Sequence, residues 1–172
     1  IVADFNQVQV EHYLEAPLDM MRYPEDLGMQ QGPLLSPDHF RRYILPSYHR
    51  LMAPAAEAGC VVHMHSDGDL HALADDLLRL PIDVLNPQAE VNGIDWLAGT
   101  LKGRMCLDLS MGGPVLDRGD PAAIDAHVRR TVETLGSRDG GLMLRYGLYP
   151  GVAMANVAAI MDAFEKYSGY FS

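Results

Sequence analysis

The stretch Val61-Val-His-Met-His-Ser-Asp-Gly-Asp69 joins a short apolar run to a dense group of polar side chains. Its first five residues, Val61 to His65, predict a buried β-strand. Ser66, Asp67 and Asp69 then follow directly. When strands run parallel, side chains that follow their carboxyl ends gather on one side of the fold, where active sites of α/β proteins lie.

The same order, a strand and then chemically capable side chains, recurs along the chain. Each strand is separated from the next by a stretch with helical periodicity, so the sequence predicts alternating strands and helices. The other expected strands are Leu18 to Tyr23, Ile82 to Leu85, Met105 to Leu109 and Leu142 to Leu144. The expected helices are residues 1 to 15, Pro37 to about Ala58, Leu70 to Leu80, Ile94 to Leu101, Pro121 to Leu135 and Val152 to Tyr167.

Two of these segments carry local signals. Ser36 can cap the helix that Pro37 opens, and Pro46 and Pro54 predict a kink or a break inside it. The segment Pro24 to Gln31 reads as a loop and lacks the glycine pattern of a dinucleotide-binding turn.

Alternating elements imply a mainly parallel sheet with helices outside it, either an open sheet or a barrel. Polar residues follow all five expected strands, which favours the barrel because its active site uses the carboxyl ends of many strands. The predicted fold class is therefore α/β, a partial (β/α)8 barrel of about five parallel strands with outer helices, forming a single domain over residues 1–172.

The net charge, the lengths of the apolar runs and the cysteine positions indicate which classes of protein to exclude. The 172 residues carry a formal net charge of −10, which argues against nucleic-acid binding. No apolar run is long enough for a membrane helix, and no secretory signal is visible. Cys60 and Cys106 lie far apart in apolar stretches, which favours a reduced, cytoplasmic setting.

Several short motifs carry a resemblance to a known family. They are Glu25-Asp-Leu-Gly-Met-Gln30, Ser36-Pro37, Ile44-Leu-Pro46, Ala58 to Gly68, Val84-Leu-Asn-Pro87, Gly119-Asp-Pro121, Tyr146-Gly-Leu-Tyr-Pro150 and Asn156-Val157. In this order they resemble the C-terminal half of the uroporphyrinogen decarboxylase and cobalamin-dependent methyltransferase superfamily. The resemblance implies a (β/α)8 barrel about twice as long as this chain.

A half-barrel would leave its first and last strands with an unpaired edge. We therefore expect the chain to form a homo-oligomer, to swap elements with a second copy, or to need a missing N-terminal half. The start at Ile1 rather than at a methionine is expected to reflect processing or a start within a gene.

The resemblance implies one of two activities. Methyltransferases of the superfamily move a methyl group between a corrinoid and a thiol with the help of zinc, whereas decarboxylases remove carboxyl groups from a tetrapyrrole without a cofactor. The zinc ligands of the methyltransferases fall on His65, Asp67 and Tyr146, of which only the histidine is kept. Aspartate and tyrosine are harder ligands, so zinc or another divalent metal with oxygen preference is expected, held with the help of Glu25 or Asp26.

The candidate site comprises residues at the ends of the expected strands. His65 is expected to be catalytic and a metal ligand, with Asp67 holding one of its ring nitrogens or the same metal. His63 lies two residues earlier on the same strand face and is either a packed core histidine or part of the site. The expected catalytic residues are His65, Asp67, Asp108 and Tyr146, and the expected substrate-binding residues are Glu25, Asp26, Asn86, Gln88 and Arg145.

Three functions follow from this reading. The first is a corrinoid-dependent, methyltransferase-like enzyme acting on a small molecule or a corrinoid protein, and His65 favours it because the decarboxylases lack a histidine there. The second is a uroporphyrinogen decarboxylase-type carboxy-lyase. The third is a truncated, non-catalytic barrel that binds a ligand or a partner.

Overall fold

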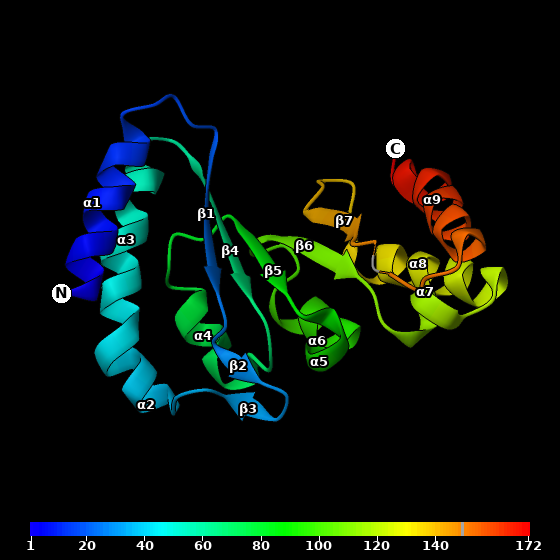
Figure 1. Cartoon of the computed structure of the whole chain (residues 1–172), viewed down its shortest axis with the longest axis horizontal. Coiled ribbons are helices and arrows are strands. Elements are labelled where there is room, and N and C mark those ends of the chain that lie inside the picture. Colours follow the sequence, from blue (N-terminus) through cyan, green and yellow to red (C-terminus); the bar gives the residue numbers. More distant parts are fainter. Residues whose placement is uncertain (149) are drawn as a thin grey trace. The chain divides into compact units, whose positions relative to one another are not determined.

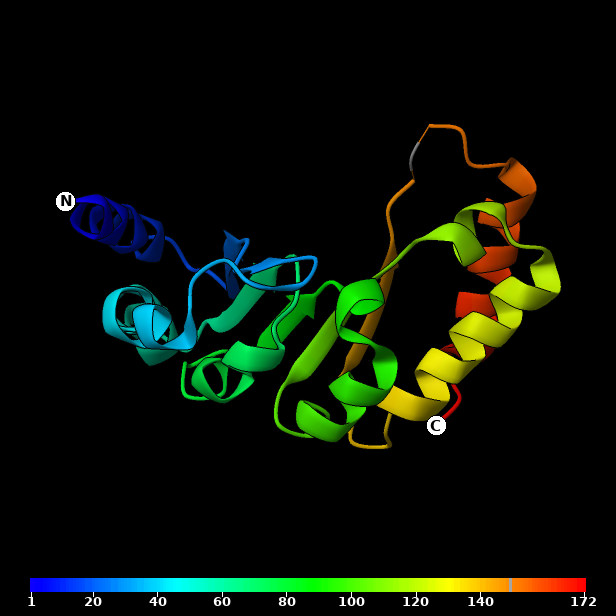
Figure 2. The same cartoon turned by 90° about the horizontal axis from the view of Figure 1, so that it is seen from below.

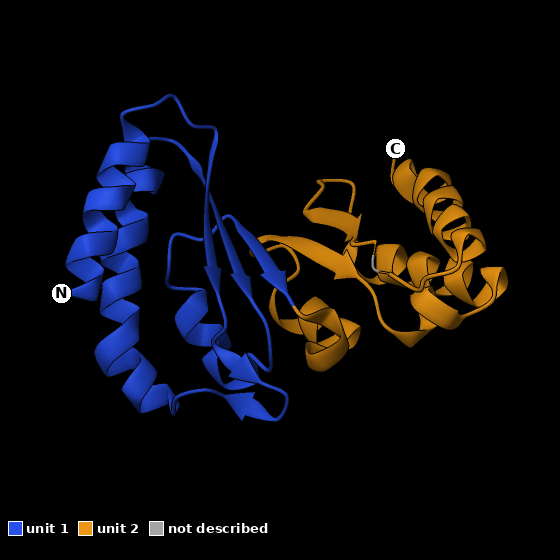
Figure 3. Ribbon diagram, in the orientation of Figure 1, with its two compact units in different colours: residues 1–87 blue, residues 88–172 orange. Residues whose placement is uncertain are grey.

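The structure, a computed structural model, describes residues 1–148 and 150–172. The chain folds into two compact units, residues 1–87 and residues 88–172, which Figure 3 distinguishes by colour. The single domain expected over residues 1–172 stays a prediction. Tyr149, which belongs to the motif between Tyr146 and Pro150, lies outside the described residues.

The first unit contains a parallel sheet in the strand order β1-β4-β5 (Figure 1). Strand β1 spans Met20–Glu25, β4 spans Val61–Ser66 and β5 spans Val84–Pro87. The central strand β4 is mostly buried, as its apolar run predicts for a strand covered on both faces.

Helices cover one face of this sheet. In Figure 2, α3 (Leu45–Glu57) and α4 (Ala74–Leu77) lie on the same side of the three strands. Helix α1 (Val2–Leu14) packs against α3. The Tyr23 hydroxyl donates a hydrogen bond to the Leu51 carbonyl oxygen in α3 at 2.9 Å, which marks the helix-facing side of β1. Because side chains alternate along a strand, the neighbours of Tyr23 in β1 point to the opposite face.

The helix expected from Pro37 begins as predicted and is interrupted near Pro46. The Ser36 hydroxyl accepts a hydrogen bond from the His39 amide at 3.3 Å and caps α2 (Pro37–His39). A π-helical turn over Phe40–Ile44 then joins α2 to α3. Proline lacks an amide hydrogen and its ring crowds the preceding turn, so the regular bond pattern changes just before Pro46.

The prediction of a loop over Pro24 to Gln31 is wrong in part. Pro24 and Glu25 extend β1, and β2 (Gly28–Met29) and β3 (Gly32–Pro33) form a small antiparallel hairpin. Proline is tolerated in β1 because, among the described residues, this strand pairs with β4 alone.

The helix expected over Leu70 to Leu80 is shorter than predicted. A 3-10 turn over His71–Leu73 leads into α4, which ends at Leu77. The Leu80 amide then bonds the Leu77 carbonyl oxygen three residues back, and Pro81 follows. A residue before proline is disfavoured in the helical conformation, which explains the early end.

The second unit places helices around two parallel strands, β6 (Cys106–Met111) and β7 (Leu142–Tyr146). Helix α8 (Pro121–Leu135) has the predicted bounds and packs against α9 (Met154–Ser168). Helix α6 (Ile94–Thr100) lies close to its predicted range. Two short helices, α5 (Ala89–Asn92) and α7 (Pro114–Arg118), were not expected because neither is long enough to show helical periodicity.

Parallel strands that alternate with helices along the chain confirm the predicted fold class, α/β with the arrangement of part of a (β/α)8 barrel. None of the helices in the described part of the chain has the length and apolar character needed to cross a membrane.

Candidate metal centre

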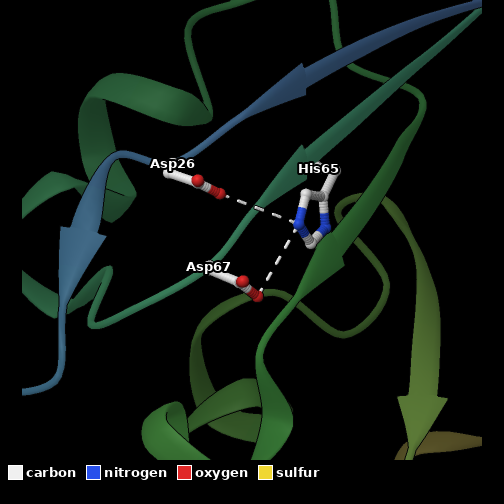
Figure 4. A group of neighbouring side chains, drawn as sticks. All are labelled: Asp26, His65 and Asp67. Carbon is white, nitrogen blue, oxygen red and sulfur yellow. Dashed lines mark ion pairs between the residues drawn. The ribbon is translucent and has the colours of Figure 1, made fainter. Parts of the chain in front are cut away.

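Three side chains from the first unit converge at the carboxyl ends of β1 and β4 (Figure 4). His65 lies near the end of β4, Asp67 follows that strand, and Asp26 follows β1. The Nε2 atom of His65 is 3.6 Å from Asp67 Oδ1 and 3.9 Å from Asp26 Oδ1. Both carboxylates thus approach the same ring nitrogen.

The other ring nitrogen of His65 is held by Asn86 in β5. His65 Nδ1 lies 2.7 Å from the Asn86 Oδ1 atom and 3.1 Å from the Asn86 backbone oxygen. A backbone carbonyl can only accept a hydrogen bond, so Nδ1 must carry the proton. In the neutral ring, the lone pair of Nε2 therefore faces the two carboxylates, which is the arrangement found for histidines that bind a metal.

Backbone contacts between two loops bring Asp26 and Asp67 together. The Leu27 amide donates to the Ser66 hydroxyl at 2.9 Å, and that hydroxyl donates to the Asp67 carbonyl oxygen at 2.9 Å. One residue further along, the Gly28 amide donates to the same carbonyl oxygen at 3.2 Å. The loop after β1 is thereby joined to the loop after β4 directly beside both carboxylates.

Gly28 and Gly68 make this loop crossing possible. A Cβ atom on either residue would overlap backbone atoms of the other loop, and Gly68 also has a φ of +80°, which favours glycine. The two glycines therefore let the loops that carry Asp26 and Asp67 approach each other, which places the two carboxylates close together.

The donor set fits a divalent cation. One ligand atom from each of Asp26, His65 and Asp67 lies within 4.8 Å of the other two. Ligand atoms about 2.1 Å from one ion lie roughly 3.0 to 3.4 Å apart in tetrahedral or octahedral geometry, so ligand atoms that are up to 4.8 Å apart would have to approach one another by up to about 1.5 Å. Both carboxylates can make that movement because the side chains of Asp26 and Asp67 are 75% and 57% exposed.

Glu25, the neighbour of Asp26, does not join this cluster. It shares the helix-facing side of β1 with Tyr23 and accepts a hydrogen bond from the Tyr48 hydroxyl of α3. Burial, together with the nearby negative charge of Asp26, raises the pKa of Glu25, and the Tyr48 hydrogen bond opposes that shift. Of the adjacent pair, only Asp26 reaches His65.

The second unit holds another group of the expected site residues. Asp108 is buried in β6 and forms an ion pair with Arg145 of β7, with 3.6 Å between Asp108 Oδ1 and Arg145 Nε. The same nitrogen donates to the Ser110 hydroxyl at 2.9 Å. Asp108, Ser110 and Arg145 share one face of the paired strands β6 and β7, since Ser110 pairs with Arg145 in register.

Tyr146 and Gln88 occupy other positions in this unit. Tyr146 follows Arg145 on β7, so its side chain lies on the opposite face, where its hydroxyl donates to Asp117 Oδ1 at 3.1 Å. Gln88 precedes α5, and its backbone oxygen accepts a hydrogen bond from the Asn92 side chain at 2.9 Å.

A cavity of about 500 Å³ also lies in the second unit, on the helix-facing side of β7. Leu142, Leu144, Phe164, Tyr167, Tyr170 and Phe171 contribute much of its wall. Its lining contains neither a carboxylate nor a histidine, so it offers no acid-base pair and no metal ligand set. Among the described residues, the group that could hold a metal ion is the Asp26, His65 and Asp67 cluster.

A protein-family model described as uroporphyrinogen decarboxylase (URO-D) matches residues 1–167. This chain belongs to the uroporphyrinogen decarboxylase family. A curated relative named uroporphyrinogen decarboxylase, from Syntrophotalea carbinolica, is 27% identical over 141 residues, which cover 78% of this chain and 39% of that protein. The family resemblance expected from the sequence motifs is therefore confirmed.

A solved structure of a methyltransferase from Methanosarcina mazei has the same fold in the aligned region, with a TM-score of 0.70. It is 19% identical, and the match covers 98% of this chain and 48% of that one. The chain thus spans less than half the length of either of these two proteins, and the likeness to the methyltransferase concerns the fold.

The resemblance to the family predicts two of the three clustered side chains as metal ligands, and that role stays a prediction. His65 and Asp67 come from the motif Ala58 to Gly68, whereas the third position implied by the resemblance, Tyr146, lies in the second unit and bonds Asp117. Within the first unit Asp26 completes the cluster instead. Asp26 was expected to bind substrate or, as an alternative to Glu25, to help to hold a metal, and the contact of Asn86 with His65 was not foreseen.

Proposed function

We propose that this chain is a methyltransferase-like member of the uroporphyrinogen decarboxylase family that uses a divalent metal ion bound by Asp26, His65 and Asp67. The convergence of these three side chains on one point, with His65 Nε2 presented as a ligand, carries the proposal. A corrinoid, free or protein-bound, is the proposed methyl donor, a small molecule is the proposed acceptor, and the cytoplasm is the proposed location.

The ligand set suits activation of a nucleophile. A divalent ion, when bound, favours the deprotonated form of a coordinated thiol or hydroxyl. His65 would supply one nitrogen ligand, and Asp26 and Asp67 would supply oxygen ligands that offset the charge of the ion. Three protein ligands leave further positions for solvent or substrate, as in catalytic rather than structural metal sites.

The composition of the site also bears on which ion it prefers. One imidazole with two carboxylates is a harder set than the histidine and cysteines expected from the superfamily's methyltransferases. Carboxylate ligands suit Mn²⁺ and Mg²⁺, whereas imidazole suits Zn²⁺ and Fe²⁺. We therefore propose a borderline to hard divalent ion, with Zn²⁺ and Mn²⁺ as the two to compare first.

Metal content of the purified chain tests the proposal. After dialysis against Zn²⁺ or Mn²⁺ and removal of free ion, mass spectrometry should find about one ion per chain in the native protein and none in His65→Ala. Asn86→Ala should bind about 10- to 100-fold more weakly because the ring loses its orienting partner. His49→Ala is the matched control, since His49 is an exposed histidine in α3 of the same unit.

Methyl transfer is then measured as thioether formation from a methylated corrinoid and a thiol. The native, metal-loaded chain should form product, and His65→Ala should not. Equal metal content in native protein and His65→Ala would overturn the proposed site.

A second candidate, a decarboxylase, is favoured by the Syntrophotalea carbinolica relative. Asp108, Ser110 and Arg145 would then matter more, because an arginine held by a buried carboxylate can bind a substrate carboxyl group. Release of carbon dioxide from a tetrapyrrole that persists in His65→Ala and in metal-free protein would favour this candidate over methyl transfer.

A further inference from the structure

Arg22 lies in the middle of β1, on the sheet face that carries the candidate metal centre. Its neighbour Tyr23 bonds Leu51 in α3, and Glu25 bonds Tyr48 in the same helix, so odd-numbered residues of β1 face the helices. Arg22 must therefore project from the opposite face, together with Pro24. Its side chain is exposed there.

The strand register places Arg22 next to the histidines of β4. Arg22 pairs with His63, and Pro24 pairs with His65, two residues further along both strands. Two residues of a strand span about 6.6 Å, so Arg22 lies one layer of side chains below His65. A small molecule bound at the metal centre can reach that layer.

No residue in the described part of the chain pairs with the charge of Arg22. Arg41 and Arg50 of the same unit form ion pairs with Asp76 and Asp4, at 2.9 Å and 2.6 Å, whereas Arg22 has neither an ion pair nor a hydrogen bond among the described residues. Asp26, which follows β1 four residues after Arg22, is about 13 Å further along the chain direction and too far for a direct pair.

The position of Arg22 in the fold favours the binding of an anion by its side chain. In a (β/α)8 barrel, the sheet face opposite the helices points into the barrel, where side chains of successive strands form packed layers. In the described chain the side chain of Arg22 is exposed on this face, so its guanidinium is accessible to an anion. A guanidinium can bind a carboxylate or a phosphate through two parallel hydrogen bonds.

We propose that Arg22 binds an oxyanion, a carboxylate or a phosphate, carried by the substrate of this site. The substrate is then a short molecule with its reacting atom at the Asp26, His65 and Asp67 cluster and its anionic group one layer deeper. This inference deepens the proposed function and rests on it for the position of the reacting atom, whereas anion binding at Arg22 is independent of any metal.

Binding of two probe anions to the metal-free chain tests the proposal. Fluoroacetate is followed by fluorine NMR and inorganic phosphate by phosphorus NMR, for the native chain and for Arg22→Gln, Arg22→Lys and Arg42→Gln. Arg42 is the matched control because it is an exposed arginine of the same unit that stacks on Tyr43.

Arg22→Gln should weaken binding of the preferred anion about tenfold or more, Arg22→Lys should weaken it less, and Arg42→Gln should leave it unchanged. The stronger of the two probes identifies the oxyanion as a carboxylate or a phosphate. Absence of saturable binding to the native chain, or equal binding by Arg22→Gln, would overturn the proposal.

Added Mn²⁺ separates this inference from the proposed function. Broadening of the bound fluoroacetate signal in the native chain, absent in His65→Ala, supports both an ion at the cluster and an anion beside it. Arginine-dependent binding without such broadening retains the role of Arg22 and contradicts the metal centre.

Discussion

The alternation of side chains between the two faces of a strand decides which neighbours single residues of this protein contact. Glu25 and Asp26 are adjacent carboxylates, yet Asp26 reaches His65 while Glu25 turns to α3 and accepts a hydrogen bond from Tyr48. The sequence alone could not separate them, because the predicted strand ended at Tyr23 and both carboxylates were placed in a loop. Once β1 is seen to continue to Glu25, the alternation assigns Glu25 to the helix side.

The position of Glu25 makes the stability of the fold depend on pH. Its folded-state pKa is raised by burial, so its contribution to stability is present at low pH and is lost as pH rises through that raised value. Glu25→Gln cannot ionise and keeps an acceptor for Tyr48. Between about pH 5 and about pH 8, the free energy of unfolding of the variant should therefore exceed that of the native chain by an amount that grows with pH. Urea unfolding measures this difference.

Glu57→Gln provides the comparison, since Glu57 is an exposed glutamate in α3. Its stability difference from the native chain should stay nearly constant over the same pH range. A Glu25→Gln difference that is equally flat would mean that burial does not perturb this carboxyl group.

At the scale of elements, the decisive feature is the crossing of the loops after β1 and β4. The Gly28 amide bonds the Asp67 carbonyl oxygen, and the Asp69 amide bonds the Met29 carbonyl oxygen at 2.8 Å. These bonds need the two backbones to approach more closely than any side chain allows. The spacing of the proposed metal ligands therefore depends on two glycines that are not themselves ligands.

Gly68→Ala should separate the two loops and weaken metal binding at least tenfold, because the added methyl group would overlap the backbone at Gly28. Gly59→Ala is the matched control. Gly59 has nearly the same φ, +79°, but nothing lies within 4 Å of an added Cβ, so it carries the conformational cost without the overlap. Both variants should lose stability, and only Gly68→Ala should lose metal affinity, measured by calorimetric titration.

Similar losses of metal affinity in the two variants would contradict this reading. They would show that general destabilisation of the first unit, rather than the loop crossing, controls the site.

Long elements were predictable from the sequence, and short ones were not. The apolar spacing in α8 gave correct bounds, and the break in the helix after Ser36 lies next to Pro46 as expected. The β2–β3 hairpin was missed because two-residue strands carry no periodicity. Their pairing depends on contacts such as the Leu34 amide with the Leu27 carbonyl oxygen, which no local pattern indicates.

At the scale of the whole molecule, both outermost strands have one partner each in the described part of the chain. β1 pairs with β4, and β7 pairs with β6. Unpaired edges of parallel strands favour association with another chain. We therefore expect the isolated 172-residue chain to self-associate, with a sedimentation coefficient that rises with protein concentration. A compact monomer that unfolds cooperatively at all concentrations would contradict this expectation.

The candidate site was predictable to the extent that its members lie at strand ends. His65, Asp67 and Asn86 were recognised from their position after apolar runs, and the structure brings them together with Asp26. The roles were less predictable than the positions. Asn86 was expected to contact substrate but holds His65, because the register pairs the two residues across β4 and β5.

The loop crossing has a consequence for how the chain unfolds. Asp26 and Asp67 are separated by a long segment that includes α2 and α3, so an ion shared between them would act as a removable cross-link. Like a disulfide, such a link restricts the unfolded ensemble, and the gain grows with the length of chain it closes. Metal supply in the cell would then govern how long the first unit survives proteolysis, since a chain without the ion opens more often.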